Sequence, residues 1–337
     1  MPLRNGGLPR HDVGAQALSR RVAAPLTQVT RAMPEQPTHW GAEALWERLA
    51  PLLPGLSVEV VARTASTNTA LLERARAAPE RRDGADDGDT GAQVRHSVES
   101  AAFGRRAIDL QPCLLVAEHQ TGGRGRQGRA WQSAAGASLT FSLALPLAAS
   151  DLSGLSLAVG VALCEALDPA GASGPRVGLK WPNDLWLMDG PVDGMSNGRK
   201  LGGILIETVT AGSQRLAIIG IGLNVREFDV PQATTGFAAL QEIDPQATAP
   251  GVLAQVALPL VQAVKQFERE GFAAFAARFE ARDLLRGHKV RTTHPDARDG
   301  VARGVSAQGA LLVQTADGVK AVSSGEVSVR LDATTAG

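Results

Sequence analysis

Alternating apolar and polar positions predict the first elements of the chain. An apolar face at helical spacing begins just after Gly41, which predicts an amphipathic helix. The apolar positions of this face are Leu45, Trp46, Leu49, Leu52 and Leu53. Residues 57–63 alternate with a period of two and predict a strand. The next residues, Ser66-Thr67-Asn68, supply N-cap candidates for a second helix, because short polar side chains can accept hydrogen bonds from the first free amides of a helix.

The middle of the chain is predicted to consist of strands and two helical segments. Apolar strands are predicted over residues 112–120, 138–147, 176–181, 185–188, 201–210 and 215–225. Helical spacing is found over residues 152–167 and 250–285. Two polar stretches, residues 79–107 and 189–199, predict surface loops, and the second of them is expected to connect a hairpin.

After Gly287, short apolar segments recur between turn residues, which is the spacing of a small β-barrel. The predicted turns are Asp299-Gly300, Gln308-Gly309, Asp317-Gly318 and Ser324-Gly325. The fold class is therefore α+β, with a mixed β-sheet packed with helices in residues 41–286 and a small C-terminal barrel in residues 287–337. Residues 1–40 are rich in Pro, Gly, Ala and Arg and show no periodicity, so we expect them to be disordered.

Composition narrows the class of protein. The 337 residues carry 34 Lys and Arg against 34 Asp and Glu, so the formal net charge is zero, which argues against a surface that binds nucleic acid throughout. The two cysteines, Cys113 and Cys164, exclude a disulfide framework and are expected to be buried free thiols. No apolar run is long enough for a membrane helix and no signal-peptide pattern is present, so we expect a cytoplasmic protein. The Arg-rich start leaves open an organelle transit peptide or an extension ahead of Met33.

The densest chemical signal is the glycine- and arginine-rich segment 123–129. Glycines let the backbone approach a ligand closely, and arginines offer permanent charge and paired donors for phosphate or carboxylate. The segment matches G-x-G-x-x-G, but a strand is predicted to follow it, whereas a dinucleotide-binding loop must open a helix. Arg129-Ala130 stands where a P-loop has Lys and a hydroxyl residue. A basic loop for single-stranded nucleic acid stays open, although Trp131 is its only aromatic residue.

Three further segments place charge or glycine at the ends of strands. Lys180 ends an apolar strand just before the turn Pro182-Asn183-Asp184. The amide and carboxylate of this turn could fix a cation at a sheet edge, or the Lys180 side chain could simply extend to solvent. Residues 199–207, Arg-Lys-Leu-Gly-Gly-Ile-Leu-Ile-Glu, and residues 220–224, Gly-Ile-Gly-Leu-Asn, contain glycines within strands. Such glycines indicate either a close approach of a ligand or tight packing between strands.

These segments, in this order, resemble those of biotin–protein ligases. The resemblance rests on Ser66-Thr67-Asn68, Gln120, and residues 123–131, 180–185, 200–207 and 220–224, and it extends over about residues 57–331. Each segment alone is a weak to moderate signal, whereas the ordered set is specific. The resemblance implies that the chain joins biotin to AMP with ATP and Mg²⁺ and passes the biotinyl group to a lysine of a biotin carboxyl carrier protein. It also implies a class II synthetase-like catalytic domain and an SH3-like C-terminal barrel.

The resemblance also implies roles for individual residues. The catalytic cations would be Lys180, bridging the biotin carboxylate and the α-phosphate, with Arg124 and Arg126. The biotin-binding residues would be Ser66, Thr67, Asn68, Gln120, Arg124, Gly125, Arg126, Lys180, Gly203 and Gly220. The residues binding ATP or the adenylate would be Gly123, Arg126, Gly128, Arg129, Trp131, Asn183, Asp184 and Asn224. Metal ligands stay unassigned.

Other functions remain open at this point. A lipoyl- or octanoyl-transferring relative on the same fold would also modify a lysine, but polar ligands at residues 66–68 would have no use against a dithiolane. A non-catalytic biotin sensor would leave the cluster of Lys180, Arg124 and Arg126 without a role. A nucleic-acid-binding module predicts an affinity for oligonucleotides that depends steeply on salt. Some family members carry an N-terminal winged helix-turn-helix, and the roughly 40 residues ahead of the first helix are too few for one, so no sequence-specific DNA binding is expected. The oligomeric state is left open.

Overall fold

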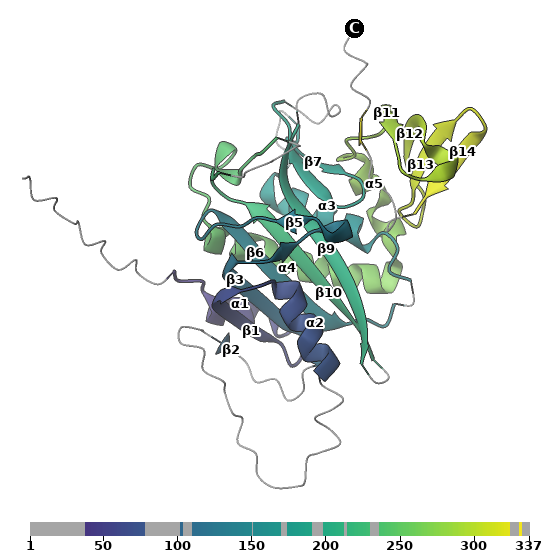
Figure 1. The fold of residues 1–337 in the computed structure, drawn as a ribbon. Coiled ribbons are helices and arrows are strands. Elements are labelled where there is room, and N and C mark those ends of the chain that lie inside the picture. The colour runs from purple at the N-terminus through teal and green to yellow at the C-terminus, as the bar shows by residue number, and fades with distance from the viewer. Residues whose placement is uncertain are drawn as a thin grey trace, which may run out of the picture. The chain divides into compact units, whose positions relative to one another are not determined.

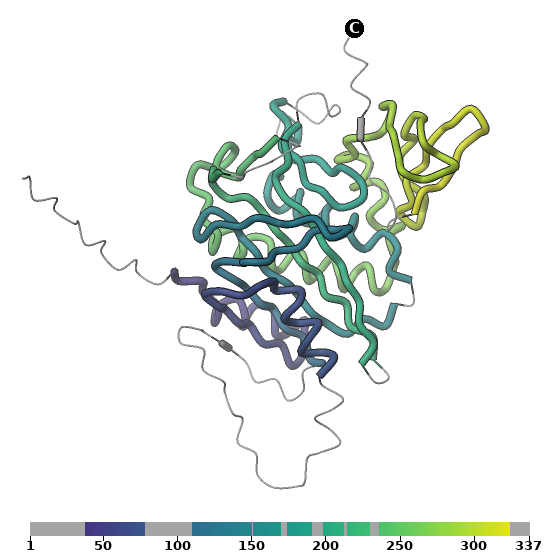
Figure 2. Tube along the Cα trace, in the orientation of Figure 1, coloured from purple at the N-terminus to yellow at the C-terminus, as the bar shows by residue number. Residues whose placement is uncertain are grey.

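A mixed eight-stranded sheet forms the centre of the computed structural model, which describes residues 38–77, 102–103, 110–149, 151–169, 174–190, 198–211, 214–229, 236–323 and 330–331. The strands are β1 (Ser57–Thr64), β2 (Ala102–Phe103), β3 (Cys113–Gln120), β6 (Ser138–Pro146), β7 (Val177–Lys180), β8 (Asp184–Leu187), β9 (Arg199–Ala211) and β10 (Gln214–Asn224). Their order is β2-β1-β3-β6-β10-β9-β8-β7, and β1 and β3 are the parallel pair in it. The path of the chain can be followed in Figure 2.

Helices cover both faces of this sheet. They are α1 (Ala42–Leu49), α2 (Thr67–Ala77), α3 (Leu155–Leu167), α4 (Ala249–Glu270) and α5 (Ala276–Glu280). Figure 1 shows α2 on the near face and α1, α3 and α4 on the far face. Successive side chains of β3 point to opposite faces of the sheet, as they do in any regular strand. Leu114 and Val116 belong to the core with α1, α3 and α4, whereas Cys113 and Leu115 belong to the core with α2.

The longest helix, α4, has clear signals at both ends. Thr248 caps its start, and the Thr248 side chain accepts a hydrogen bond from the backbone N–H of Gly251 at 3.2 Å. Gly271 ends it with a φ of 66°, a conformation that glycine adopts without steric cost, and its N–H donates to the carbonyl of Phe267 at 2.8 Å.

The C-terminal region is a five-stranded antiparallel sheet of β11 (Lys289–Arg291), β12 (Asp299–Val305), β13 (Leu311–Thr315), β14 (Gly318–Val322) and β15 (Arg330–Leu331). The indole N–H of Trp181 donates to the carbonyl of Gly309 at 2.9 Å in a buried position and so joins this sheet to the turn that follows β7. Gly309 also lies so close to Gly154 that a Cβ at residue 309 would be 2.8 Å from the Cα of Gly154. The α+β class and the small C-terminal sheet predicted from sequence are confirmed.

Four local predictions are corrected by the structure. Leu52 lies beyond the end of α1 and is 38% exposed, because helical spacing no longer applies there. The polar stretch 79–107 includes β2, which pairs with β1 at the sheet edge, and the rest of that stretch lies outside the described residues. The predicted turn Asp299-Gly300 belongs to β12, because it pairs with β11. The helical region ends at Glu280, since the following backbone bonds to Leu179 of the edge strand β7 instead.

Other predictions concern single features. Cys113 and Cys164 are buried free thiols, as expected, and burial raises the pKa of Cys164 to about 12. Among the described residues, no helix combines the length and apolar character needed to cross a bilayer. The predicted disorder of residues 1–40 and the predicted turn Ser324-Gly325 fall largely or wholly on residues outside the described ranges.

Candidate active site

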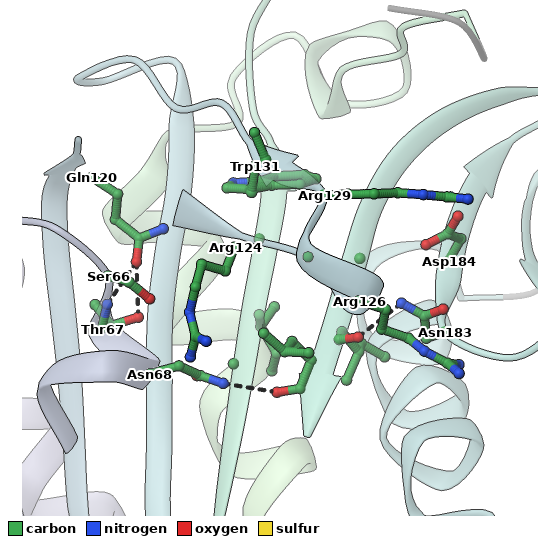
Figure 3. A pocket seen from close by; sticks show the side chains of 18 of the residues that line it. Ser66, Thr67, Asn68, Gln120, Arg124, Arg126, Arg129, Trp131, Asn183 and Asp184 are labelled. Carbon is green, nitrogen blue, oxygen red and sulfur yellow. Dashed lines mark hydrogen bonds between the residues drawn. The ribbon is translucent and has the colours of Figure 1, made fainter. Parts of the chain in front are cut away.

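A cavity opens where the start of α2, the ends of β3 and β8, and the middle of β9 and β10 meet under a short hairpin. The hairpin consists of β4 (Gly123–Arg124), a 3-10 turn (Arg126–Gly128) and β5 (Ala130–Trp131), and residues 123–131 are called the arginine hairpin below. The empty space in the cavity is about 760 Å³ when its open mouth is included. In Figure 3, uncharged polar side chains gather at one end and charged ones at the other.

The uncharged end is a network of buried hydrogen bonds around the first turn of α2. The backbone N–H of Thr67 donates to Oε1 of Gln120 at 2.7 Å, and the Thr67 hydroxyl lies 2.6 Å from that of Ser142. The Ser142 hydroxyl donates to Oδ1 of Asn68 at 2.6 Å, and Ser66 lines the same end. Buried polar groups of this kind hold fixed orientations, because breaking a bond would leave a partner unsatisfied. This end is therefore preorganised for a neutral ligand group with donors and acceptors.

Glycines on β10 make room for side chains that line the cavity. A Cβ at Gly220 would lie 2.2 Å from Oδ1 of Asn68, and a Cβ at Gly222 would lie 2.4 Å from the Trp131 ring. Neither distance is possible for a real side chain, so both positions require glycine for close approach. The close approach predicted from glycines within strands is thus made here by Asn68 and Trp131.

The charged end combines three cations, Lys200, Arg126 and Arg129, with one carboxylate, Asp184. Nζ of Lys200 lies 2.9 Å from Oδ1 of Asp184, and the Asn183 amide donates to the carbonyl of Ile204 at 2.9 Å. Arg126 from the arginine hairpin points into this end, and its Nη2 is buried without a hydrogen-bond partner. Burial lowers the pKa of Arg126, and the Asp184 carboxylate opposes that shift. A buried guanidinium donor without a partner favours an anionic ligand, because such a donor costs free energy until it is bonded.

Arg124 lies nearer to Asn68 than Arg126 does, and its guanidinium forms an ion pair with Glu207. Its Nη2 is 2.7 Å and 3.0 Å from the two carboxylate oxygens of Glu207 on β9. The amide of Asn68 donates to the same carboxylate at 3.0 Å and to the carbonyl of Leu205 at 3.1 Å. One carboxylate thus joins the arginine hairpin to the uncharged end of the cavity.

Most of the residues predicted from sequence lie together around this cavity. Those that line it are Ser66, Thr67, Asn68, Gln120, Arg124, Gly125, Arg126, Arg129, Trp131, Asn183, Asp184, Gly203 and Gly220. Four predicted residues are not among the lining residues, namely Gly123, Gly128, Lys180 and Asn224.

These four residues have structural surroundings of their own. Gly123 lies where a Cβ would meet the Trp131 carbonyl at 2.4 Å, and Gly128 takes a φ of 72° in the tip of the hairpin. The Nζ of Lys180 lies 4.7 Å from the ring centroid of Trp186. The amide of Asn224 donates to two backbone carbonyls, at 3.0 Å and 3.3 Å, and is buried.

Three residues of the site were missed from sequence. Ser142 and Glu207 complete the hydrogen-bond network, and Lys200 supplies the cation beside Asp184. A signal for Ser142 exists, because it and Thr140 are polar positions inside an otherwise apolar strand. Lys200 and Glu207 lie seven positions apart in β9. Lys200 meets Asp184 because β9 pairs with β8, and Glu207 meets Arg124 through a side-chain contact with the hairpin.

The arrangement suits a ligand that is neutral and polar at one end and anionic at the other. Within the described residues, no group of three or more His, Cys, Asp and Glu side chains could hold a metal ion alone. The trio of Arg126, Arg129 and Lys200 around a single carboxylate, Asp184, leaves the charged end net positive. Positive charge held in a partly buried site stabilises phosphate and carboxylate groups.

Comparison with known proteins gives matches along most of the chain. Residues 109–224 match the Biotin/lipoate A/B protein ligase family, and residues 289–330 match the Biotin protein ligase C terminal domain. The chain is 32% identical to the Biotin--[acetyl-CoA-carboxylase] ligase of Mycobacterium tuberculosis over 304 residues, which is 85% of this chain and 91% of that protein. It is 36% identical over 221 residues to the Bifunctional ligase/repressor BirA of Escherichia coli, covering 64% of this chain but only 65% of BirA.

The fold is also similar to that of a solved structure. The biotin protein ligase from Aquifex aeolicus in complex with biotin and ATP superposes with a TM-score of 0.59 at 26% identity. The superposition covers 82% of this chain and 99% of the Aquifex chain.

Proposed function

The chain belongs to the biotin protein ligase family, and from that membership and the geometry of the cavity we propose that it is an ATP-dependent biotin–protein ligase. In the proposed reaction a biotin carboxylate oxygen attacks the α-phosphorus of ATP, forming biotinyl-AMP and releasing pyrophosphate. The amine of an acceptor lysine then attacks the biotinyl carbonyl carbon, forming an amide and releasing AMP and a proton. The division into a catalytic region, residues 41–286, and a C-terminal region, residues 287–337, is part of this proposal.

The observation that carries the proposal is the two-ended cavity. Biotin has a neutral ureido group at one end and a carboxylate at the other, and the cavity has matching ends. Thr67, Asn68 and Gln120 offer fixed donors and acceptors for the ureido ring. Arg126 and Lys200 stand at the other end, where the biotin carboxylate and the α-phosphate of ATP would meet.

Cations are the main catalytic device for the first step. Two anions must approach each other, and negative charge builds on the phosphoryl oxygens as the bond forms, so a positioned cation lowers the barrier. Arg126 brings an unsatisfied buried donor to this point. We keep Lys180 as the proposed bridging cation, because it pairs in register with Asp184 at the edge of the cavity. Lys200, with its Nζ 2.9 Å from Oδ1 of Asp184, is proposed as a second cation.

The arginine hairpin lies over the cavity and would protect the intermediate. A mixed anhydride hydrolyses in water, and a cover over the site limits that loss. The Trp131 ring of the hairpin packs against the backbone of Gly222, and we propose that it forms a wall for the adenine ring. Gly125, Arg129 and Asn183 complete the proposed nucleotide side.

Magnesium fits the site as a companion of ATP. Asp184 is the carboxylate among the lining residues of the described cavity and is the proposed protein ligand. Mg²⁺ is usually held by one or two carboxylates together with substrate phosphates, which matches a site without a full protein cage. When bound, it would neutralise phosphate charge.

The proposed acceptor is a biotin carboxyl carrier protein or domain of a biotin-dependent carboxylase. Its support is the similarity to the Mycobacterium tuberculosis ligase, whose name specifies acetyl-CoA carboxylase. The acceptor lysine must reach the biotinyl carbonyl, which would lie between the two ends of the cavity.

Pyrophosphate release tests the first step. The purified full chain is incubated with MgATP and one acid at a time, namely biotin, lipoate or octanoate. Release with biotin alone is expected, because the uncharged end is built from hydroxyl and amide groups. Release with lipoate or octanoate but not with biotin would contradict the proposal and point to acyl transfer on the same fold.

A further inference from the structure

Glu207 is the point at which the arginine hairpin, the first turn of α2 and strand β9 meet. Its carboxylate accepts hydrogen bonds from Arg124 at 2.7 Å and 3.0 Å and from the amide of Asn68 at 3.0 Å. The Glu207 side chain is 26% exposed, whereas that of Arg124 is 43% exposed, so the pair is partly shielded from water. Figure 3 shows Arg124 pointing from the hairpin towards Asn68.

The arginine hairpin depends on such contacts for its position. Its two strands pair with each other and not with the main sheet, since β4 and β5 form a separate two-stranded sheet. A two-stranded hairpin is marginally stable alone, so side-chain contacts must hold it over the cavity. The pair of Arg124 with Glu207 is a two-bond contact of this kind, reaching from the hairpin to a central strand.

The same contact changes the role of Arg124. A guanidinium that is paired with a carboxylate contributes little net charge to an incoming anion. Arg126 has a buried donor without a partner, so the anion-binding charge of the hairpin lies with Arg126. Arg124 is thereby left to hold the hairpin in place.

We propose that Glu207 is a positioning residue that holds the arginine hairpin closed through Arg124 and orients the Asn68 amide, so that the hairpin and the uncharged end of the cavity are coupled. The coupling follows from the shared carboxylate, because a change at Asn68 reaches Arg124 through one side chain. Its consequence for catalysis rests on the proposed function, whereas its consequence for the hairpin does not.

The hairpin is tested first, without any substrate. Amide hydrogen exchange is measured by mass spectrometry on peptides covering residues 121–132 in the wild type and in Glu207→Gln. Gln keeps the shape but loses the charge, and exchange is expected to be about fivefold faster, the scale of a partly exposed ion pair. Glu165→Gln is the matched control, because Glu165 also takes two bonds from one arginine, Arg278, but lies on α3 away from the cavity. Equal exchange in the wild type and Glu207→Gln would overturn the proposal.

Kinetics then separate positioning from a purely structural role. In Glu207→Gln the KM for biotin in pyrophosphate release is expected to rise roughly tenfold, with kcat changed by less than about threefold, because the lost bonds orient a ligand contact and not the reacting atoms. Arg124→Gln combined with Glu207→Gln is expected to be no worse than Glu207→Gln alone, because that change already perturbs both contacts of the carboxylate. Additive effects, or a loss confined to kcat, would overturn the proposal. Wild type that releases no pyrophosphate with biotin would contradict the proposed function, and the exchange result would still decide the hairpin contact.

Discussion

Replacing Gly220 by alanine would disturb the uncharged end of the cavity through one defined clash. A Cβ at residue 220 would lie 2.2 Å from Oδ1 and 2.8 Å from Cγ of Asn68. Ordinary contact begins at 3.4 Å, so Asn68 would have to move by about 1.2 Å. It is held in place by Ser142 at 2.6 Å, by the carbonyl of Leu205 at 3.1 Å and by Glu207 at 3.0 Å. A shift of that size would break at least one of these bonds.

The cost follows from these contacts. Overpacking costs about 1–3 kcal/mol, and an unsatisfied buried polar group costs about 1–3 kcal/mol more. We therefore expect Gly220→Ala to lower the free energy of unfolding by about 3 kcal/mol. Biotin affinity is expected to fall roughly 100-fold, or about 2.7 kcal/mol, because the Asn68 amide no longer faces the ligand.

A double-variant cycle identifies the clash as the cause. Urea unfolding and calorimetric titration with biotin are compared for Gly220→Ala, Asn68→Ala and the two combined. Alanine at residue 68 removes the three side-chain atoms that the new Cβ would meet, so the combined variant is expected to be as stable as Asn68→Ala alone. Costs that add to within about 0.5 kcal/mol would refute the packing described here.

Four other variants probe the charged end and a buried acid. Lys180→Ala is expected to slow pyrophosphate release about 100-fold or more, and Lys200→Ala to slow it as well; near-wild-type release by Lys180→Ala would contradict its bridging role. Arg126→Gly is expected to release biotinyl-AMP into solution, measured by chromatography of the filtrate, and retention of the intermediate as in wild type would contradict the covering role of the hairpin. Burial raises the pKa of Asp283 to about 6 from 3.8, so its charged form is disfavoured in the fold and the cost is present above pH 6 and lost as the pH falls towards 4. Asp283→Asn should raise the unfolding free energy by about 2–3 kcal/mol at pH 7.5 and by about half of that at pH 5, and a pH-independent difference would show that Asp283 does not titrate in this way.

Elements with a strong local pattern could be predicted from sequence. The alternation of residues 57–63 predicted β1, and the polar residues Ser66-Thr67-Asn68 marked the start of α2. Strand segments that form only because a neighbouring strand pairs with them could not be predicted. The two residues of β2 form a strand because β1 lies beside them, and Asp299-Gly300 joins β12 because β11 pairs with it.

The residues of the candidate site could also be predicted only in part. Ser66, Asn68 and Arg126 were found because their residue types are concentrated in short segments. Lys200 was not assigned a role, because its position beside Asp184 depends on the pairing of β8 with β9. That pairing shifts its register between Leu185 and Trp186. Irregularities of this kind depend on tertiary packing.

Transfer of biotin to an acceptor lysine is the most direct test of the proposed function. The full chain, MgATP and biotin are incubated with a purified biotin carboxyl carrier domain, and the domain is examined by intact-mass and peptide mass spectrometry. The account predicts one biotinyl amide on one lysine, dependent on both ATP and biotin and absent when that lysine is replaced by arginine. An unmodified carrier domain in the presence of all components, or modification by lipoate in place of biotin, would contradict it.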